Sequence, residues 1–188
     1  MKRTVLTFGL ISGAILAAMM ALTMALHDQI GFGKVGLIIG YTTMVIAFMM
    51  IFVGIKSYRD NISGGAISFG KAFQVGILIT AIASACYVAT WEVIYYNFMP
   101  DFTDKYAAYE TTKAKESGAT EAQLAAKAKE MADFKEMYKN PLINIALTLI
   151  EPLPVGLVMT LVAAGVLSRK RDREKLASTN GGVAPSAI

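Results

Sequence analysis

Four apolar stretches, each long enough to cross a bilayer, constrain what this chain can fold into. They run from Thr4 to Leu26, from Val35 to Ile55, from Ala72 to Met99 and from Pro141 to Ser168. A hydrocarbon core about 30 Å thick needs about 20 helical residues. A segment that crosses lipid alone must satisfy its own backbone hydrogen bonds, so each stretch is predicted to be a helix. The sequence therefore predicts an all-α, polytopic membrane protein with four transmembrane helices.

Composition supports lipid as the solvent of this chain. Hydrophobic residues make up 55% and charged residues only 17% of its 188 residues. The formal charge of +4 is carried by short basic runs beside the apolar stretches, which favours a role in topology over nucleic-acid binding. The first stretch exceeds the apolar region of about 7 to 15 residues in a signal peptide, so we expect it to persist as a span.

The distribution of basic residues predicts the orientation. Basic side chains are concentrated on cytoplasmic segments of membrane proteins. On that rule both termini are cytoplasmic, the 100–140 segment lies on the opposite side, and Lys56, Arg59 and Lys71 are cytoplasmic anchors. The basic residues before the first span, between the second and third, and after the fourth are Lys2, Arg3, Lys56, Arg59, Lys71, Arg169, Lys170, Arg171, Arg173 and Lys175.

The 100–140 segment is predicted to be an extracytoplasmic helical hairpin between the third and fourth spans. It is rich in Ala, Lys and Glu and is broken at Ser117-Gly118-Ala119. Thr120 and Gln123 then form a capping-box pattern that marks a helix start. We assign residues 1–175 to one transmembrane domain that includes this insertion. Residues 176–188, which are small and polar, are predicted to form a disordered cytoplasmic tail.

An apolar stripe follows the second helix of that insertion. Its members are Leu124, Met131, Phe134 and Tyr138, at a spacing that places them on one helical face. The stripe is suited to docking on the chain's own bundle, and it also suits contact with the membrane or with a partner helix.

Two acids, Glu92 and Glu151, fall within or near the spans. A charged side chain at the centre of a membrane helix costs about 2.5 to 3.5 kcal/mol on insertion scales, so it normally faces protein or water. One interpretation is a proton- or cation-responsive pair near an outward-facing cavity, where two carboxylates share a proton. The other places Glu92 at the interface, beside its aromatic neighbours, and gives Glu151 a structural hydrogen-bonding role.

Prolines follow directly after one of these acids. Pro152 and Pro154 lack backbone N–H groups and are predicted to bend the fourth span, freeing the carbonyls of Thr148 and Ile150. Such a bend occurs in ion pathways and also in inert bundles.

Small residues in the first two spans predict close helix packing. Gly9 and Gly13 are four residues apart, as are Gly36 and Gly40. This spacing suits helix–helix contact within the chain or in a homo-oligomer.

Residue types that support chemistry are scarce. One cysteine, Cys86, and one histidine, His27, allow neither an intramolecular disulfide nor a Cys/His metal site. We identify no catalytic motif, so no catalytic residue, metal ligand or cofactor is predicted.

Several runs together resemble a known family. They are Ile39–Met44, Ile51–Asp60, Phe69–Phe73 and Glu151–Leu157, and they include Gly-Ile-Lys-Ser-Tyr-Arg-Asp and Glu-Pro-Leu-Pro-Val-Gly. Between Thr4 and Arg171 the chain resembles the bacterial membrane family catalogued as domain of unknown function 4199. The resemblance implies a small multi-span protein of a bacterial envelope, and supplies no activity or cofactor.

The combined prediction is a multi-pass protein of the bacterial cytoplasmic (inner) membrane, most simply a non-enzymatic interaction or accessory component. Its partners would be the lipid bilayer and a membrane protein or a second copy of itself. The alternative is a small proton- or cation-coupled transporter or channel that uses Glu151, alone or together with Glu92.

Overall fold

The computed structural model describes residues 1–180, which are helical with short connections and include no strand. Side chains are described for residues 1–168, apart from Asp28 and Gln29. The helices are α1 (Lys2–Ala25), α2 (His27–Ile30), α3 (Lys34–Asn61), α4 (Phe69–Asn97), α5 (Phe102–Glu116), α6 (Glu121–Tyr138), α7 (Pro141–Leu149) and α8 (Pro152–Asn180).

Four helical segments of the described chain are long and apolar enough to cross a membrane. They are α1, α3, α4 and the segment Pro141–Ser168, which combines α7 with most of α8. The four predicted spans are therefore confirmed as helices of spanning type. Their ends differ where polar residues continue a helix: α3 extends past Ile55 to Asn61, because hydropathy marks the edge of the apolar stretch and not the end of the helix. Similarly, α8 continues past Leu176, the predicted start of the tail, to Asn180, and residues 181–188 lie outside the described chain.

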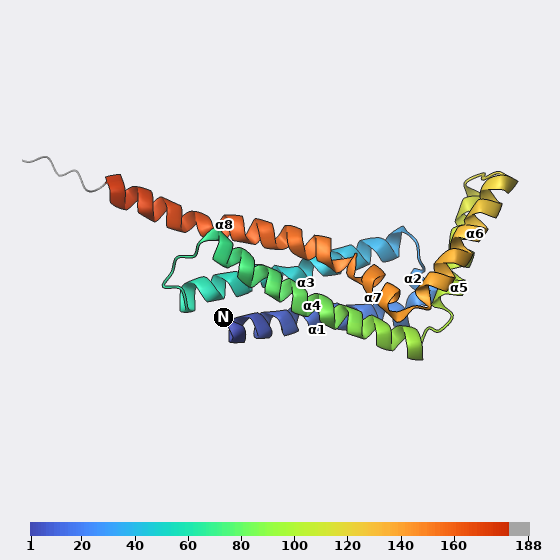
Figure 1. Ribbon diagram of the computed structural model, residues 1–188, viewed down its shortest axis with the longest axis horizontal. Coiled ribbons are helices and arrows are strands. Elements are labelled where there is room, and N and C mark those ends of the chain that lie inside the picture. The colour runs from blue at the N-terminus through green and yellow to red at the C-terminus, as the bar shows by residue number, and fades with distance from the viewer. Residues whose placement is uncertain (181–188) are drawn as a thin grey trace, which may run out of the picture.

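The long helices run alongside one another, and the short ones gather at one end (Figure 1). The N-terminus and the α3–α4 connection lie at the opposite end. We call the end that carries α2, α5 and α6 the insertion end. α4 is central, since it contacts α1, α3, α7 and α8. The main core lies between the long helices, where Phe48, Ile51, Val75 and Ile79 are fully buried.

Glycines Gly9 and Gly13 allow α1 to lie close to α4. A Cβ atom added at Gly9 would lie 2.8 Å from Cβ of Ile82, and one at Gly13 would lie 2.6 Å from Cβ of Cys86. Both distances are too short for non-bonded carbon atoms, so only glycine fits this contact. In this structure the predicted small-residue face packs within the chain.

The second pair of glycines does not form a helix-packing face within the described chain. A Cβ at Gly36 would meet only the preceding turn, 2.8 Å from the carbonyl oxygen of Gly31, and one at Gly40 would meet nothing within 4 Å. Both residues line a cavity at the insertion end, so among the described residues this pair does not pack against another helix of the chain. Packing of Gly36 and Gly40 in a homo-oligomer stays a prediction.

A reciprocal glycine–threonine contact joins α4 to α8. The spacing of glycines in the sequence does not predict it. A Cβ at Gly76 would lie 2.7 Å from Cγ2 of Thr160, and one at Gly156 would lie 2.3 Å from Cγ2 of Thr80. The two threonine hydroxyls are 3.2 Å apart and fully buried. Each helix thus presents a glycine to the other helix's threonine, which brings the backbones together.

The three predicted anchors differ in their surroundings. Lys56 is exposed, and Lys71 donates a hydrogen bond to Gln74 at 2.9 Å. Arg59 is only 6% exposed, and its Nε lies 2.7 Å from Asp60 Oδ1. Arg59 therefore does not extend freely from the surface as an anchor would, because it is packed against the bundle.

Helices α5 and α6 pack against each other at the insertion end (Figure 1). The predicted capping box is confirmed: Thr120 N–H donates to Gln123 Oε1 at 2.9 Å, and Gln123 N–H donates to Thr120 Oγ1 at 3.4 Å. Lys135 of α6 pairs with Asp104 of α5. In the apolar stripe, Met131 and Tyr138 are buried and Phe134 is half-buried. The stripe therefore packs against other residues of the same chain.

Candidate functional site

The fourth span is interrupted at one of the predicted site residues. α7 ends at Leu149 and α8 begins at Pro152, so Glu151 lies between two helices. Pro152 offers no N–H to the carbonyl of Thr148, and Pro154 offers none to that of Ile150. The predicted disruption at these prolines is confirmed, and it exposes the Glu151 side chain at a gap in the helical ladder.

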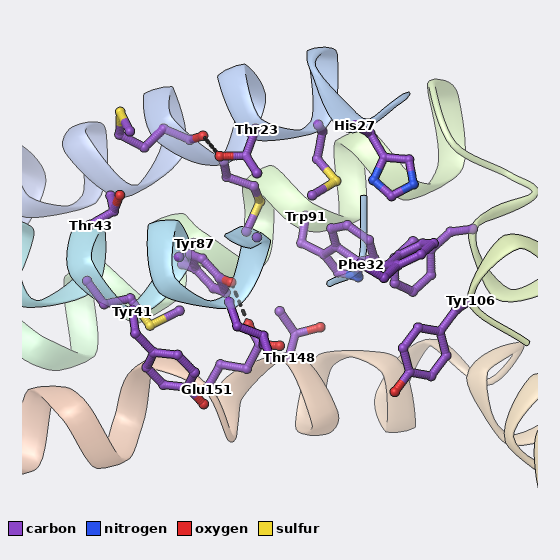
Figure 2. Close-up of a pocket in the computed structure, with 18 of the residues that line it drawn as sticks. Thr23, His27, Phe32, Tyr41, Thr43, Tyr87, Trp91, Tyr106, Thr148 and Glu151 are labelled. Atoms are coloured by element: carbon purple, nitrogen blue, oxygen red, sulfur yellow. Dashed lines mark hydrogen bonds between the residues drawn. The ribbon is translucent and has the colours of Figure 1, made fainter. Parts of the chain in front are cut away.

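Glu151 faces a cavity and bonds to a tyrosine from another helix. The hydroxyl of Tyr87, on α4, donates to Glu151 Oε2 at 2.6 Å (Figure 2). Among the described side chains, none of the ion pairs involves Glu151. The carboxyl group is therefore oriented by a neutral donor and has no cationic neighbour within salt-bridge distance in the described chain.

The cavity has a volume of about 440 Å³, within the range of small-molecule pockets. Its walls come from helices α1 to α7 and from the α2–α3 turn, and most of its lining is apolar, with four methionines and several aromatic rings. The residues that line it are Leu16, Met19, Met20, Thr23, Met24, His27, Gly31, Phe32, Gly36, Leu37, Gly40, Tyr41, Thr43, Met44, Tyr87, Trp91, Phe102, Tyr106, Phe134, Tyr138, Leu147, Thr148 and Glu151.

Aromatic rings close the cavity at the insertion end. The Phe32 ring centroid lies 4.3 Å from that of His27 and 5.5 Å from that of Tyr106. Phe102 meets Trp91 edge to face, with centroids 4.7 Å apart. Such edge-to-face pairs each contribute about 0.5 to 1.5 kcal/mol beyond burial. The α5–α6 insertion thus supplies part of the cavity wall.

A buried hydrogen-bond network supports this wall. Trp91 Nε1 lies 2.9 Å from the Tyr138 hydroxyl and 3.1 Å from Asn144 Oδ1. Thr148 Oγ1 lies 3.2 Å from the same amide oxygen. The Tyr138 hydroxyl accepts from the indole N–H, and burial raises the pKa of this hydroxyl to about 12. The network joins α4, α6 and α7.

The two predicted acids are not brought together in one cavity. Glu92, itself a described residue, does not line the cavity, whereas its neighbour Trp91 does. Successive helical residues are about 100° apart around the axis, so the ring of Trp91 takes the cavity side. Glu92 Oε1 is buried without a hydrogen-bond partner among the described residues. This arrangement does not support the interpretation of a shared proton.

Tyr87 and Asn144 belong to the site but are not predicted from the sequence. A signal for Tyr87 is present, since it precedes Trp91 by four residues and therefore shares its helical face. Asn144 is a buried polar residue within an apolar span, which also marks a position that needs partners. Which helix would meet these side chains depends on tertiary packing.

The fold and the site define the class of this protein. It is a helical chain with four segments of membrane-spanning type, and the fourth segment is interrupted beside an apolar cavity. The family model described as "Protein of unknown function (DUF4199)" matches residues 7–169. The match covers most of the chain, which therefore belongs to this family, as the resemblance indicated. No curated protein and no solved structure matches the chain significantly.

Proposed function

We propose that this chain is a non-enzymatic protein of the bacterial cytoplasmic membrane that binds a small, largely apolar molecule in its cavity. The observation that carries the proposal is the lining of that cavity, which combines methionines and aromatic rings with one carboxylate, Glu151. Binding pockets typically have this mixture of apolar walls and a few oriented polar groups. The hydroxyl of Tyr87 donates a hydrogen bond to Glu151, so the pair suits recognition of a bound molecule better than nucleophilic attack on it.

We further propose that the insertion end is extracytoplasmic and that both termini are cytoplasmic. The basic residues near the N-terminus and between α3 and α4 support this orientation. The α5–α6 pair would then form a helical hairpin outside the membrane. In this orientation the cavity lies toward the outer side of the membrane.

The single tryptophan of the chain gives a direct test, because Trp91 lines the cavity. Bromine quenches tryptophan fluorescence at short range, so bromododecanol should quench Trp91 saturably in lipid nanodiscs. A Gly40→Phe variant should lose the saturable component, since Gly40 lines the cavity and has open space beyond its Cα. Quenching that rises linearly with probe and is equal in both proteins would contradict the proposal.

An accessory role implies a partner, either another membrane protein or a second copy of this chain. The α6 stripe is used internally, so the partner would meet the charged outer surface of α5 and α6. A photo-cross-linking residue in place of the exposed Glu121 should give one discrete adduct in native membranes. The same residue in place of Lys56, at the other end of the bundle, serves as the control. Identical adduct patterns from both positions would contradict a partner site on this surface.

A second candidate function is proton- or cation-coupled transport. The helix interruption beside Glu151 favours it, because broken helices with a polar residue at the break occur at ion sites in transporters. Liposomes that contain the protein should then show a flux that Glu151→Gln abolishes. Glu92→Gln should leave that flux unchanged, because Glu92 does not line the cavity. Liposomes as tight as protein-free vesicles would exclude this function.

A further inference from the structure

Part of the hydrogen-bonding capacity of the Glu151 carboxyl group is unused within the described chain, and this group faces the cavity. Oε2 accepts from Tyr87, while no hydrogen bond from a described residue reaches Oε1. A carboxylate accepts up to about four hydrogen bonds through its two oxygens. Because an unpaired charge at membrane depth is costly, a cation from outside the chain would stabilise this group.

The walls around Glu151 add a second form of complementarity. The rings of Tyr41 and Tyr87 line the cavity together with the carboxylate (Figure 2). Aromatic faces attract ammonium groups, and quaternary ammonium ligands are commonly held by aromatic rings. Methionine, leucine and phenylalanine supply half of the other lining residues, and these side chains suit a hydrocarbon chain and adapt to its shape.

We propose that the cavity binds a lipophilic amine, with its cationic nitrogen at Glu151 and its hydrocarbon part along the methionine- and aromatic-lined wall. This inference deepens the proposed function and rests on it. The charge of the ligand follows from the single acidic residue of the lining, and no lysine or arginine lines the cavity among the described residues. An anionic lipid or fatty acid would place like charges together at Glu151.

Competition in uncharged phosphatidylcholine nanodiscs tests the proposal. Bromododecanol is bound first, and recovery of Trp91 fluorescence is followed as dodecylamine, dodecanol or dodecanoic acid is added. Dodecylamine should displace the probe from the wild-type protein at about tenfold lower concentration than dodecanol, a ratio equivalent to about 1.4 kcal/mol. Dodecanoic acid should be the weakest competitor. This order is measured on the wild-type chain and does not depend on a variant that folds.

Matched variants assign the preference to one carboxylate. In Glu151→Gln, which keeps a hydrogen-bond acceptor for Tyr87, dodecylamine and dodecanol should displace bromododecanol at equal concentrations. Glu92→Gln removes a carboxyl group from outside the cavity and should keep the tenfold preference. Equal displacement by amine and alcohol in the wild type, or a preference that survives Glu151→Gln, would overturn the proposal while leaving the cavity as a binding site. Absence of saturable bromododecanol quenching would instead overturn the proposed function itself.

Discussion

At the insertion end, Asn144 of α7 shares its partner Trp91 of α4 with Tyr138 of α6. It is 0% exposed, and its side-chain oxygen lies within hydrogen-bond distance of Trp91 on α4 and of Thr148 on its own helix. Tyr138 of α6 also accepts from Trp91. A typical hydrogen bond contributes about 0.5 to 1.5 kcal/mol to stability. The position of Trp91 in the cavity wall therefore depends on Asn144 and Tyr138 together.

An Asn144→Leu variant should be less stable by about 0.5 to 1.5 kcal/mol, the contribution of a typical hydrogen bond. Trp91 and Thr148 each lose one acceptor, but Trp91 keeps the Tyr138 hydroxyl and Thr148 keeps the backbone carbonyl of residue 144. The purified protein in detergent micelles should unfold at lower temperature, and Trp91 emission should shift in wavelength as one of its two hydrogen bonds is lost. Asn97→Leu makes the same chemical change at an exposed position of α4 and should alter stability by less than about 0.5 kcal/mol. Equal effects of the two substitutions would argue against the network.

At the scale of elements, the contact between α4 and α8 sets how closely the second half of the bundle packs. Gly76 and Gly156 each face the other helix's threonine, and the two threonine hydroxyls lie 3.2 Å apart. Because this contact lies beyond the break at Glu151, it fixes α8 while α7 turns toward α6. Close packing here therefore positions the carboxylate at the cavity.

A Gly156→Ala substitution should disrupt this crossing, because its Cβ would lie 2.3 Å from Thr80 Cγ2. Overpacking of this kind typically costs about 1 to 3 kcal/mol, so the thermal unfolding temperature should fall. Gly165→Ala, on the same helix, meets nothing within 4 Å and should be neutral or slightly stabilising. An unchanged unfolding temperature in Gly156→Ala would contradict the close contact between α4 and α8.

The sequence alone predicts where most helices lie along the chain. It does not predict which face of each helix contacts another helix. Apolar length predicted four spanning-type helices, Thr120 and Gln123 predicted the start of α6, and the prolines predicted the break beside Glu151. All of these are local properties of the chain. The faces are not local: Gly36 and Gly40 have the same spacing as Gly9 and Gly13, yet only Gly9 and Gly13 pack against another helix. Glycine spacing shows only that two helices can approach closely. Whether they do depends on which helix packs against the glycines.

The same limit applies to the two acids. Glu92 and Glu151 are expected at similar depths from their positions along the spans, because depth follows from helical rise. The rotation of α4 about its axis places Trp91, and not Glu92, at the cavity. That rotation is set by packing against α1, α3 and α8, which no single span encodes.

For the whole molecule, the proposed orientation has the insertion end outside the cell and the N-terminus inside. Labelling of single cysteines tests this orientation in a Cys86→Ala background, since Cys86 is the only native cysteine. A membrane-impermeant maleimide should label Ser117→Cys, between α5 and α6, in intact cells. Ile62→Cys, between α3 and α4, should react only after the membrane is opened. The reverse pattern would invert the topology, and labelling of both sites in intact cells would contradict four spans.

The central claim is that the cavity at the insertion end holds a small molecule by means of Glu151. Native mass spectrometry of the protein released gently from its own membranes tests this claim most directly, because the cell supplies the ligand. We predict a wild-type adduct whose mass corresponds to an amine-bearing lipophilic molecule, reduced in Glu151→Gln and absent in the cavity-filling Gly40→Phe. A wild-type chain recovered only in its bare form, or an adduct equally abundant in all three proteins, would contradict the claim.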